Sequence, residues 1–328
     1  MLQSKEALKR SKNLLAFSAG GDSTALFFLL LENNISFDIV IVDYGLRLQS
    51  KEEVAYAQEL AKKYNLQCFV HNAKSIESNF EANARKIRYD FFEKLIQEHN
   101  YTALLTAHHL GDRFEWMLMQ FCKGAGCAEL TGMQSISKRN GYTLYRPLLQ
   151  VDKSDLLEYL HKKNIQYFED ESNSDEKYKR NSFRKLHTTP LLQEYKEGIK
   201  RSFSYMDEDV ATLIQTQQIH TCNQLAYFQT SHSKRSDIYA IDKYLKSQGH
   251  IMSAKERALL KTEEAVVLGR KYIIAFHKEF IFIAPFVKSE KMDKKFKEQM
   301  RILKIDPKLR GYLALDAEAV VLLSSLLQ

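Results

Sequence analysis

Short apolar runs alternate with amphipathic stretches along the first half of the chain. Apolar runs that end in polar or glycine-containing turns are typical of buried strands, whereas the stretches between them have the spacing of helices. Strands are expected at residues 14–17, 37–42, 68–70 and 103–107. Helices are expected at residues 23–31, 51–64, 79–98 and 111–121. This alternation predicts an α/β domain with a Rossmann-like parallel sheet that is covered by helices on both faces.

The pattern changes after residue 149. A helix is expected at 153–163, and the stretch 169–184 is too charged to be buried. A helical segment at 190–217 precedes a small α+β module, whose clearest element is an apolar hairpin at 271–284 around His277, Lys278 and Glu279. We therefore expect three parts, which are an α/β domain at 1–190, a helical linker at 191–217 and an α+β module at 218–328.

Composition narrows the class of protein. The chain has 328 residues and four cysteines without a C-x-x-C pair, so neither a disulfide framework nor a cysteine-bound cluster is expected. No apolar run approaches the roughly 18 residues of a membrane helix. The first residues also lack the pattern of a signal peptide. These features predict a cytoplasmic protein that does not associate with a membrane.

Positive charge is concentrated in the second half. Of the net charge of +7, residues 196–328 contribute +6, from 22 lysines and arginines against 16 acidic residues. A basic surface is typical of proteins that bind a phosphate backbone, because each neutralised phosphate releases counterions. A solvated surface without a partner is the alternative reading of the same charge.

A small-residue loop joins the first expected strand to the first expected helix. Its sequence is Ser18-Ala19-Gly20-Gly21-Asp22-Ser23. Small residues let backbone N–H groups approach a phosphate, and the helix N-terminus adds partial positive charge. The two serine hydroxyls are further donors, and Asp22 is a candidate ligand for the Mg²⁺ that accompanies a nucleotide. An ordinary serine-capped turn is the alternative.

Three candidate catalytic residues follow the strand expected at 103–107. His108, Asp112 and Glu115 have the spacing i, i+4, i+7, which places the two carboxylates on one helical face. Acidic side chains in a first helical turn also stabilise the helix dipole, so a purely structural role stays open here. Arginine pairs at helical spacing form a further motif, which comprises Arg85 with Arg88 and Arg180 with Arg184.

These motifs together resemble those of the tRNA(Ile)-lysidine synthetases, which belong to the PP-loop ATP pyrophosphatase superfamily. The loop resembles S-G-G-x-D-S, with Ala19 in the position where glycine is usual, and residues 108–115 resemble H-H-x-x-D-x-x-E. Departures from the family pattern are Tyr44 for histidine, Lys123 for arginine and Gly111 for a first aspartate. The other matching segments are residues 42–47, 81–89, 123–126, 146–149, 169–173 and 180–184.

The resemblance implies a ligase that forms a carbon–nitrogen bond. In this family ATP adenylates the C2 oxygen of the wobble cytidine in an isoleucine tRNA with a CAU anticodon. The ε-amine of free L-lysine then displaces AMP, and the resulting lysidine changes codon reading from AUG to AUA. ATP and Mg²⁺ are the implied cofactors, tRNA and lysine are the implied partners, and the chain is expected to be a monomer or homodimer.

The resemblance also implies roles for individual residues. The expected catalytic residues are Asp22, His108, Asp112, Glu115 and Arg180, with Asp22 and Asp112 as Mg²⁺ ligands. The expected ATP-binding residues are Ser18, Ala19, Gly20, Gly21, Asp22, Ser23, Asp43 and Arg88. The expected tRNA-binding residues are Lys123, Gly124, Asn181 and Arg184.

Three other functions fit the sequence less well than lysidine formation does. A tRNA-thiolating enzyme of the same superfamily needs a catalytic cysteine or an iron–sulfur cluster, for which the sequence has no C-x-x-C signal. A synthetase that amidates a small metabolite has no need for the basic second module. An RNA-binding protein with an inactive ATP site has no need for Asp22, Asp112 and Glu115.

Overall fold

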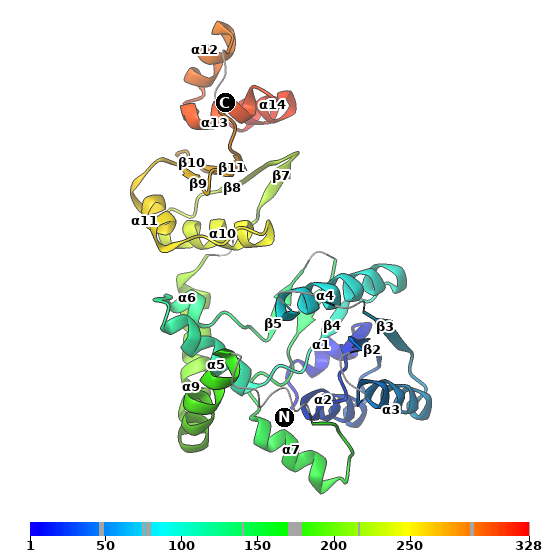
Figure 1. Ribbon diagram of the computed structural model, residues 1–328. Coiled ribbons are helices and arrows are strands. Elements are labelled where there is room, and N and C mark those ends of the chain that lie inside the picture. Colours follow the sequence, from blue (N-terminus) through cyan, green and yellow to red (C-terminus); the bar gives the residue numbers. More distant parts are fainter. Residues whose placement is uncertain are drawn as a thin grey trace. The chain divides into compact units, whose positions relative to one another are not determined.

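The chain folds into two compact units, residues 1–207 and 208–328. The computed structural model, shown as a ribbon in Figure 1, describes residues 1–45, 49–73, 76, 80–139, 141–169, 179–215, 217–288 and 292–327. Each unit has its own hydrophobic core, so each is described separately below. The long helix α9 (Thr189–Leu213) continues through the point where the two units divide.

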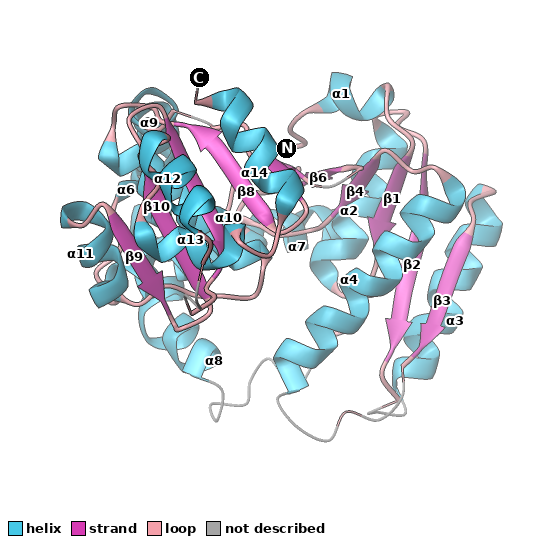
Figure 2. Cartoon of the chain, turned by 90° about the horizontal axis from the view of Figure 1, so that it is seen from above, coloured by secondary structure: helices cyan, strands magenta, loops and turns pink. Residues whose placement is uncertain are grey.

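The first unit is built on a six-stranded sheet with the order β3-β2-β1-β4-β6-β5. Five of these strands are parallel and β5 is antiparallel to β6. Figure 2 shows the arrowheads of β2 and β3 at the same end of the sheet. The strands are β1 (Asn13–Ala16), β2 (Phe37–Asp43), β3 (Cys68–Asn72), β4 (Ala103–Leu105), β5 (Ile136–Lys138) and β6 (Thr143–Tyr145).

Helices cover both faces of this sheet because its central strands are apolar on both sides. Leu15 and Ile39 belong to a core with α2, α3 and α7, whereas Leu14 and Val40 belong to a core with α4. Figure 1 shows α4 on one side of the strands and α2 and α3 on the other. The helices of the unit before α9 are α1 (Lys5–Lys9), α2 (Gly21–Glu32), α3 (Gln49–Tyr64), α4 (Phe80–His99), α5 (Leu110–Phe121), α6 (Cys127–Leu130), α7 (Lys153–Lys162), α8 (Lys179–Phe183) and the π-helical η2 (Arg184–Thr188).

The strands and helices expected up to residue 163 are confirmed, with bounds that differ by one or two residues, and α9 ends four residues before the expected helix at 190–217. Two differences matter for the site. Helix α2 begins at Gly21, so Asp22 and Ser23 lie in its first turn. The β5–β6 hairpin was not expected, because both strands have only three residues and their alternation is too short to stand out. The Asn-Gly sequence at 140–141 was the available signal, since this dipeptide favours hairpin turns.

The second unit is a five-stranded antiparallel sheet with helices on both faces. The strand order is β7-β8-β11-β10-β9, and the expected hairpin is confirmed as β10 paired with β11. Ile274 and Ile283 pack with α10 and α11, whereas Ile273 and Phe282 pack with α12, α13 and α14. The elements are β7 (His220–Cys222), β8 (Leu225–Gln229), α10 (Lys234–Ser247), α11 (Ala254–Thr262), β9 (Ala265–Leu268), β10 (Tyr272–Phe276), β11 (Phe280–Pro285), α12 (Lys294–Ile302), α13 (Pro307–Leu313) and α14 (Ala317–Leu326).

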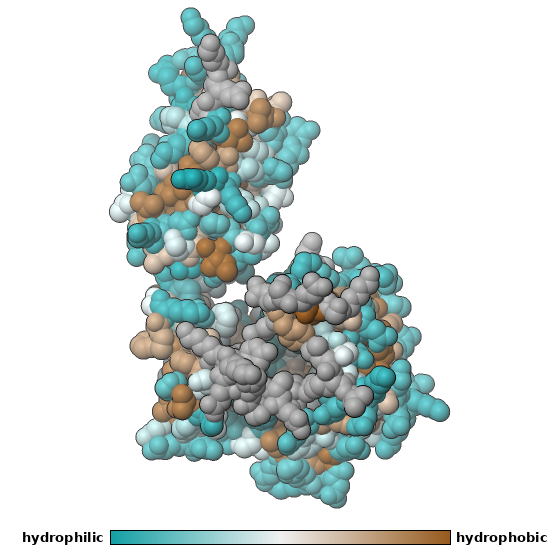
Figure 3. Space-filling model, viewed as in Figure 1, coloured by the Kyte–Doolittle hydropathy of each residue, from teal (hydrophilic) through white to brown (hydrophobic). Residues whose placement is uncertain are grey.

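The surface residues coloured in Figure 3 are mostly polar on the face shown. On the coloured part of each unit, hydrophilic residues predominate and small hydrophobic patches lie between them. Among the described helices, none has the length and apolar character that a membrane span requires.

Candidate active site

The candidate site lies where the strand order of the first sheet reverses. The chain moves outward from β1 to β2 and β3, and then returns so that β4 pairs with β1 on its other side. The loop after β1 leads into α2, and the loop after β4 leads into α5. Because the carboxyl ends of parallel strands share one edge, both loops meet at the position where open α/β sheets bind ligands.

The loop at residues 18–23, called the phosphate loop below, is held in shape by hydrogen bonds among its own residues. The Ser23 hydroxyl accepts from the Ser18 backbone N–H at 3.2 Å and donates to the Gly20 carbonyl at 3.0 Å. Ala19 has a φ of 58°, in the left-handed region that favours glycine. No side chain caps the N-terminus of α2, so the backbone N–H groups of its first turn are suited to an anion. Gly21 lets α7 pack closely, because a Cβ there would lie 2.9 Å from the Leu157 side chain.

His109 links the two loops. Its Nε2 lies 3.7 Å from Asp22 Oδ2 and 3.6 Å from Asp112 Oδ2, while its Nδ1 accepts from the Gly111 N–H at 3.0 Å. Because Nδ1 accepts this hydrogen bond, Nε2 is the ring nitrogen that faces the two carboxylates. The imidazole is therefore oriented as a bridge between the phosphate loop and helix α5.

The sequence motifs single out His108, which lies close enough to Asp112 to lower its pKa and whose Nδ1 is 2.9 Å from Thr106 Oγ1. They do not single out His109. The available signal was spacing, because His109 and Asp112 occupy the N-cap and N3 positions of a capping box. The structure also explains why glycine stands at position 111, where the family pattern has an aspartate. A Cβ at that position would lie 2.8 Å from the His109 ring, so glycine lets the imidazole sit close to the helix.

Asp112 and Glu115 share one cationic partner. Arg184 of η2 donates from Nε to Glu115 Oε2 at 2.7 Å and from Nη2 to Asp112 Oδ1 at 3.1 Å. Burial alone would raise the pKa of Asp112, but His109, His108 and Arg184 together hold the pKa well below its usual range. Asp112 is therefore ionised at neutral pH. The two carboxylates form a site that already accommodates a planar cation.

Helix α5 is fixed in place by a buried arginine on its opposite side. Arg113 is 2% exposed, donates to Asp207 of α9 at 2.5 Å and lies 4.2 Å from the centre of the Phe203 ring. Phe203 also packs edge-on against Phe114 of α5. These contacts position the carboxylates of α5 from behind, since a packed helix holds side chains more precisely than a loop does.

Asp43 and Arg88 lie at the end of β2 and on α4. Asp43 Oδ1 accepts from the Gly45 N–H at 2.7 Å. Tyr44, which replaces the usual histidine, donates its hydroxyl to the Ala84 carbonyl of α4 at 3.0 Å. Burial raises the pKa of Tyr44, and the neighbouring Arg88 partly offsets this shift. Tyr44 therefore anchors α4, and Arg88 is exposed beside it.

The expected tRNA-binding residues are spread over two segments. Lys123 is exposed after α5, and Gly124 has a φ of 77°, which explains the glycine. Asn181 is half-buried on α8. The side chain of Arg180 lies outside the described residues, as do Arg47 and residues 170–178, so those predictions stay open.

Asp22 fits a role as a metal ligand better than Asp112 does. Asp22 Oδ1 is buried, and within the described part of the chain nothing hydrogen-bonds to it. A buried carboxylate oxygen without a donor is suited to a hard cation such as Mg²⁺. Both oxygens of Asp112 already accept hydrogen bonds, from Arg184 and from the His109 backbone N–H. A metal on Asp112 would share these oxygens with the two donors and would lie close to the positive charge of Arg184.

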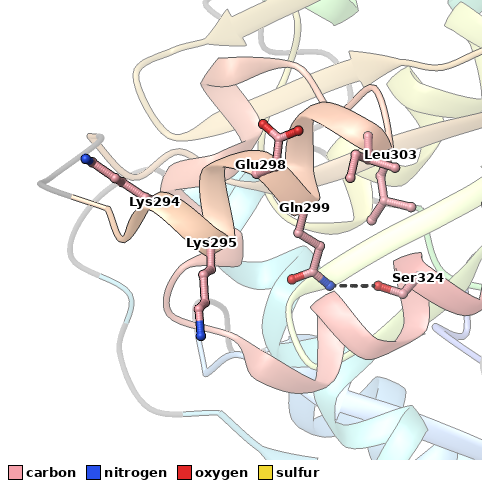
Figure 4. Close-up of a pocket in the computed structure, with 7 residues that line it drawn as sticks. Lys294, Lys295, Glu298, Gln299, Leu303 and Ser324 are labelled. Carbon is pink, nitrogen blue, oxygen red and sulfur yellow. Dashed lines mark hydrogen bonds between the residues drawn. The ribbon is translucent and has the colours of Figure 1, made fainter.

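A surface hollow of about 580 Å³ lies in the second unit. The residues that line it are far in the sequence from those of the candidate active site. It is lined by α12 and α14, and Figure 4 shows the Lys294 and Lys295 amines extending outward from α12. Gln299 donates to the Ser324 hydroxyl across it at 3.2 Å. The hollow contains none of the residues that the sequence motifs single out.

Comparison with known proteins identifies the family. A family model described as the PP-loop domain matches residues 1–190. A tRNA(Ile)-lysidine synthase from Wolinella succinogenes is 46% identical over 312 residues, which is 95% of each chain. The chain belongs to the tRNA(Ile)-lysidine synthase family. Two further lysidine synthases, from Campylobacter jejuni and Helicobacter pylori, are each 44% identical and cover 93% and 94% of this chain, and 93% and 91% of their own lengths.

The family assignment and the expected fold class are thus confirmed. Among solved structures, the tRNA thiolase NcsA of Methanococcus maripaludis matches with a TM-score of 0.52 at 18% identity, over 62% of this chain and 74% of that chain. At this identity the match supports the fold alone. Thiolation is not favoured, because the relatives that span nearly the whole chain are lysidine synthases.

The Arg184 cluster generates a prediction for its two carboxylates. We expect Asp112→Asn and Glu115→Gln each to lower tRNA modification by roughly hundredfold, since removing one member of a buried charge pair is costly to binding. Activity and the free energy of unfolding are measured on the same preparations. Glu158→Gln on α7, where an exposed carboxylate pairs with Lys162, is the matched control. Full activity in both variants would assign the carboxylates to helix stability alone.

Proposed function

We propose that this protein converts the wobble cytidine of an isoleucine tRNA with a CAU anticodon into lysidine. The observation that carries the proposal is the meeting of the phosphate loop with the Asp112–Glu115 pair at one sheet edge, bridged by His109. The phosphate loop suits a triphosphate, and the carboxylates of Asp112 and Glu115 suit a cation. The near full-length family match supplies the substrate class.

The proposed reaction has two steps, an adenylation and a displacement. The C2 oxygen of the cytidine attacks the α-phosphorus of ATP, the bond to the β-phosphate breaks, and pyrophosphate leaves. The lysine ε-amine then attacks C2, and the C2–oxygen bond breaks with AMP as the leaving group. The amine has an ordinary pKa of about 10.4, so it must lose a proton before or during the attack. A carboxylate of the site or His108 is the proposed acceptor.

The residues of the chain bind and orient the reactants. The N-terminal turn of α2 and the Gly20–Gly21 backbone are proposed to hold the phosphates, since small residues and uncapped N–H groups suit an anion. Bound Mg²⁺ would neutralise phosphate charge, and Asp22 Oδ1 is the proposed ligand. Asp112 and Glu115 are proposed to bind the lysine ammonium in exchange for Arg184, which then turns to phosphate. The present ion pair supports this, because it demonstrates a cation in that position.

The second unit is proposed to bind the tRNA body. Helix α12 has exposed Lys294, Lys295 and Lys297 on a short segment, and residues 196–328 contribute +6 of the net charge of +7. Phosphate contacts from such residues position an RNA without reading its sequence. Choice of the target cytidine is therefore assigned to the first unit, near Lys123, Gly124 and residues 180–184. A tRNA substrate also places the proposed reaction in the cytoplasm.

Removing the candidate metal ligand tests the phosphate loop. We expect Asp22→Ala to reduce lysine- and tRNA-dependent pyrophosphate release to background while the protein stays folded, because the side chain supports a ligand and not the core. Asp155→Ala on α7 is the matched control, since the Asp155 and Asp22 side chains are 33% and 31% exposed and each faces a basic group. Pyrophosphate release at the wild-type rate by Asp22→Ala would overturn the loop assignment.

Truncation tests the role of the second unit. A chain that ends at Gln217 retains the first unit and α9, so we expect it to keep ATP binding and to lose most tRNA affinity. For the full chain, the logarithm of affinity falls by roughly one unit per logarithm of salt for each phosphate contact. The measurement is tRNA affinity of both proteins at several salt concentrations. Equal affinity with an equal salt slope would show that the second unit does not bind the tRNA.

A further inference from the structure

An exposed tryptophan lies beside the candidate active site. Trp116 is one helical turn after Asp112 on α5, at the i+4 spacing that makes two side chains neighbours on the helix surface. Its side chain is 43% exposed, and it is the only tryptophan of the chain. An exposed indole beside a polar site offers a flat apolar face on which a planar ligand can stack.

The indole is held by its contact with the segment that follows α6. A Cβ at Gly132 would lie 2.4 Å from Trp116 Nε1 and 3.2 Å from Cδ1, so only glycine leaves room for the ring. This contact fixes one edge of the indole while the side chain remains partly exposed. A ring that is already positioned loses little conformational entropy when a planar ligand stacks on it.

Basic side chains lie along the part of α5 that carries Trp116. Arg184 is 28% exposed and pairs with Asp112 and Glu115, which offsets one of their two negative charges. Lys123 is exposed just after the end of α5, about two turns beyond Trp116. Proteins that bind single-stranded RNA combine aromatic faces for the bases with positive side chains for the phosphates. An aromatic face between a basic side chain and the catalytic carboxylates has this composition.

We infer that Trp116 is a stacking platform for a nucleobase of the tRNA anticodon loop next to the modified cytidine. The inference rests on the proposed function, since a cytidine that reacts beside Asp112 brings its loop neighbours within one helical turn of the indole. Stacking holds the flanking base and so orients the cytidine toward the site. The adenine of ATP has the same stacking chemistry, and the experiment below separates the two sources.

Fluorescence provides a direct test because the chain has a single tryptophan. The full-length protein is titrated with an anticodon stem-loop RNA that contains the CAU anticodon, and separately with MgATP. We expect the RNA to quench the indole emission and MgATP alone to leave it unchanged. Replacing single loop bases by abasic residues then identifies the stacked base, as the one whose removal abolishes quenching. Emission that is unchanged by the RNA, or quenched by MgATP alone, would overturn the inference.

Substitution distinguishes stacking from a structural role. We expect Trp116→Ala to raise the KM for tRNA by roughly ten- to hundredfold, with the KM for ATP and the melting temperature unchanged, and Trp116→Phe to restore most of the loss. Tyr205→Ala, which removes a 63% exposed ring from α9, is the matched control. If the wild-type enzyme is active and Trp116→Ala leaves the KM for tRNA unchanged, the stacking inference is wrong and the proposed function stands. A wild-type enzyme that forms no lysidine contradicts the proposed function itself.

Discussion

The pairing of β1 with β4 is the constraint on which the site depends. These strands are separated by two other strands and three helices in the sequence, yet they are direct neighbours in the sheet. Their pairing brings the phosphate loop after β1 and the histidine-rich turn after β4 to the same edge. The contacts of His109 with Asp22 and Asp112 follow from it. Without this reversal of strand order, the anion site and the cation site would lie on separate parts of the fold.

Charge balance at this edge explains how buried carboxylates are tolerated. Glu115 is 1% exposed, and an isolated ion at such a position would cost several kcal/mol. Arg184 compensates for this cost by donating to both Glu115 and Asp112. The same arrangement prepares the pair for a substrate cation, because a ligand that replaces Arg184 inherits a desolvated site with both acceptors already oriented. In the proposed mechanism, structural stabilisation and binding of the substrate cation are therefore two uses of one electrostatic feature.

The sequence predicted the parallel sheet and most elements well because the central strands are short apolar runs between amphipathic helices. It also predicted the loop, since a glycine-containing strand–helix turn is a local feature. Long-range partners could not be predicted in this way. Arg184 was assigned to RNA, and its contact with α5 depends on tertiary packing across about seventy residues. His109 was passed over because its neighbour His108 has the more regular spacing, whereas the orientation of His109 depends on the room that Gly111 leaves.

The central claim is that one sheet edge joins ATP chemistry to lysine transfer on tRNA. It is tested most directly by incubating the full-length protein with isoleucine tRNA bearing a CAU anticodon, ATP and isotopically labelled lysine, followed by mass spectrometry of the nuclease-digested tRNA. The account predicts the label on the wobble nucleoside, dependent on ATP and accompanied by AMP. A wobble cytidine that remains unmodified under these conditions, or that gains a mass without the lysine label, would contradict it.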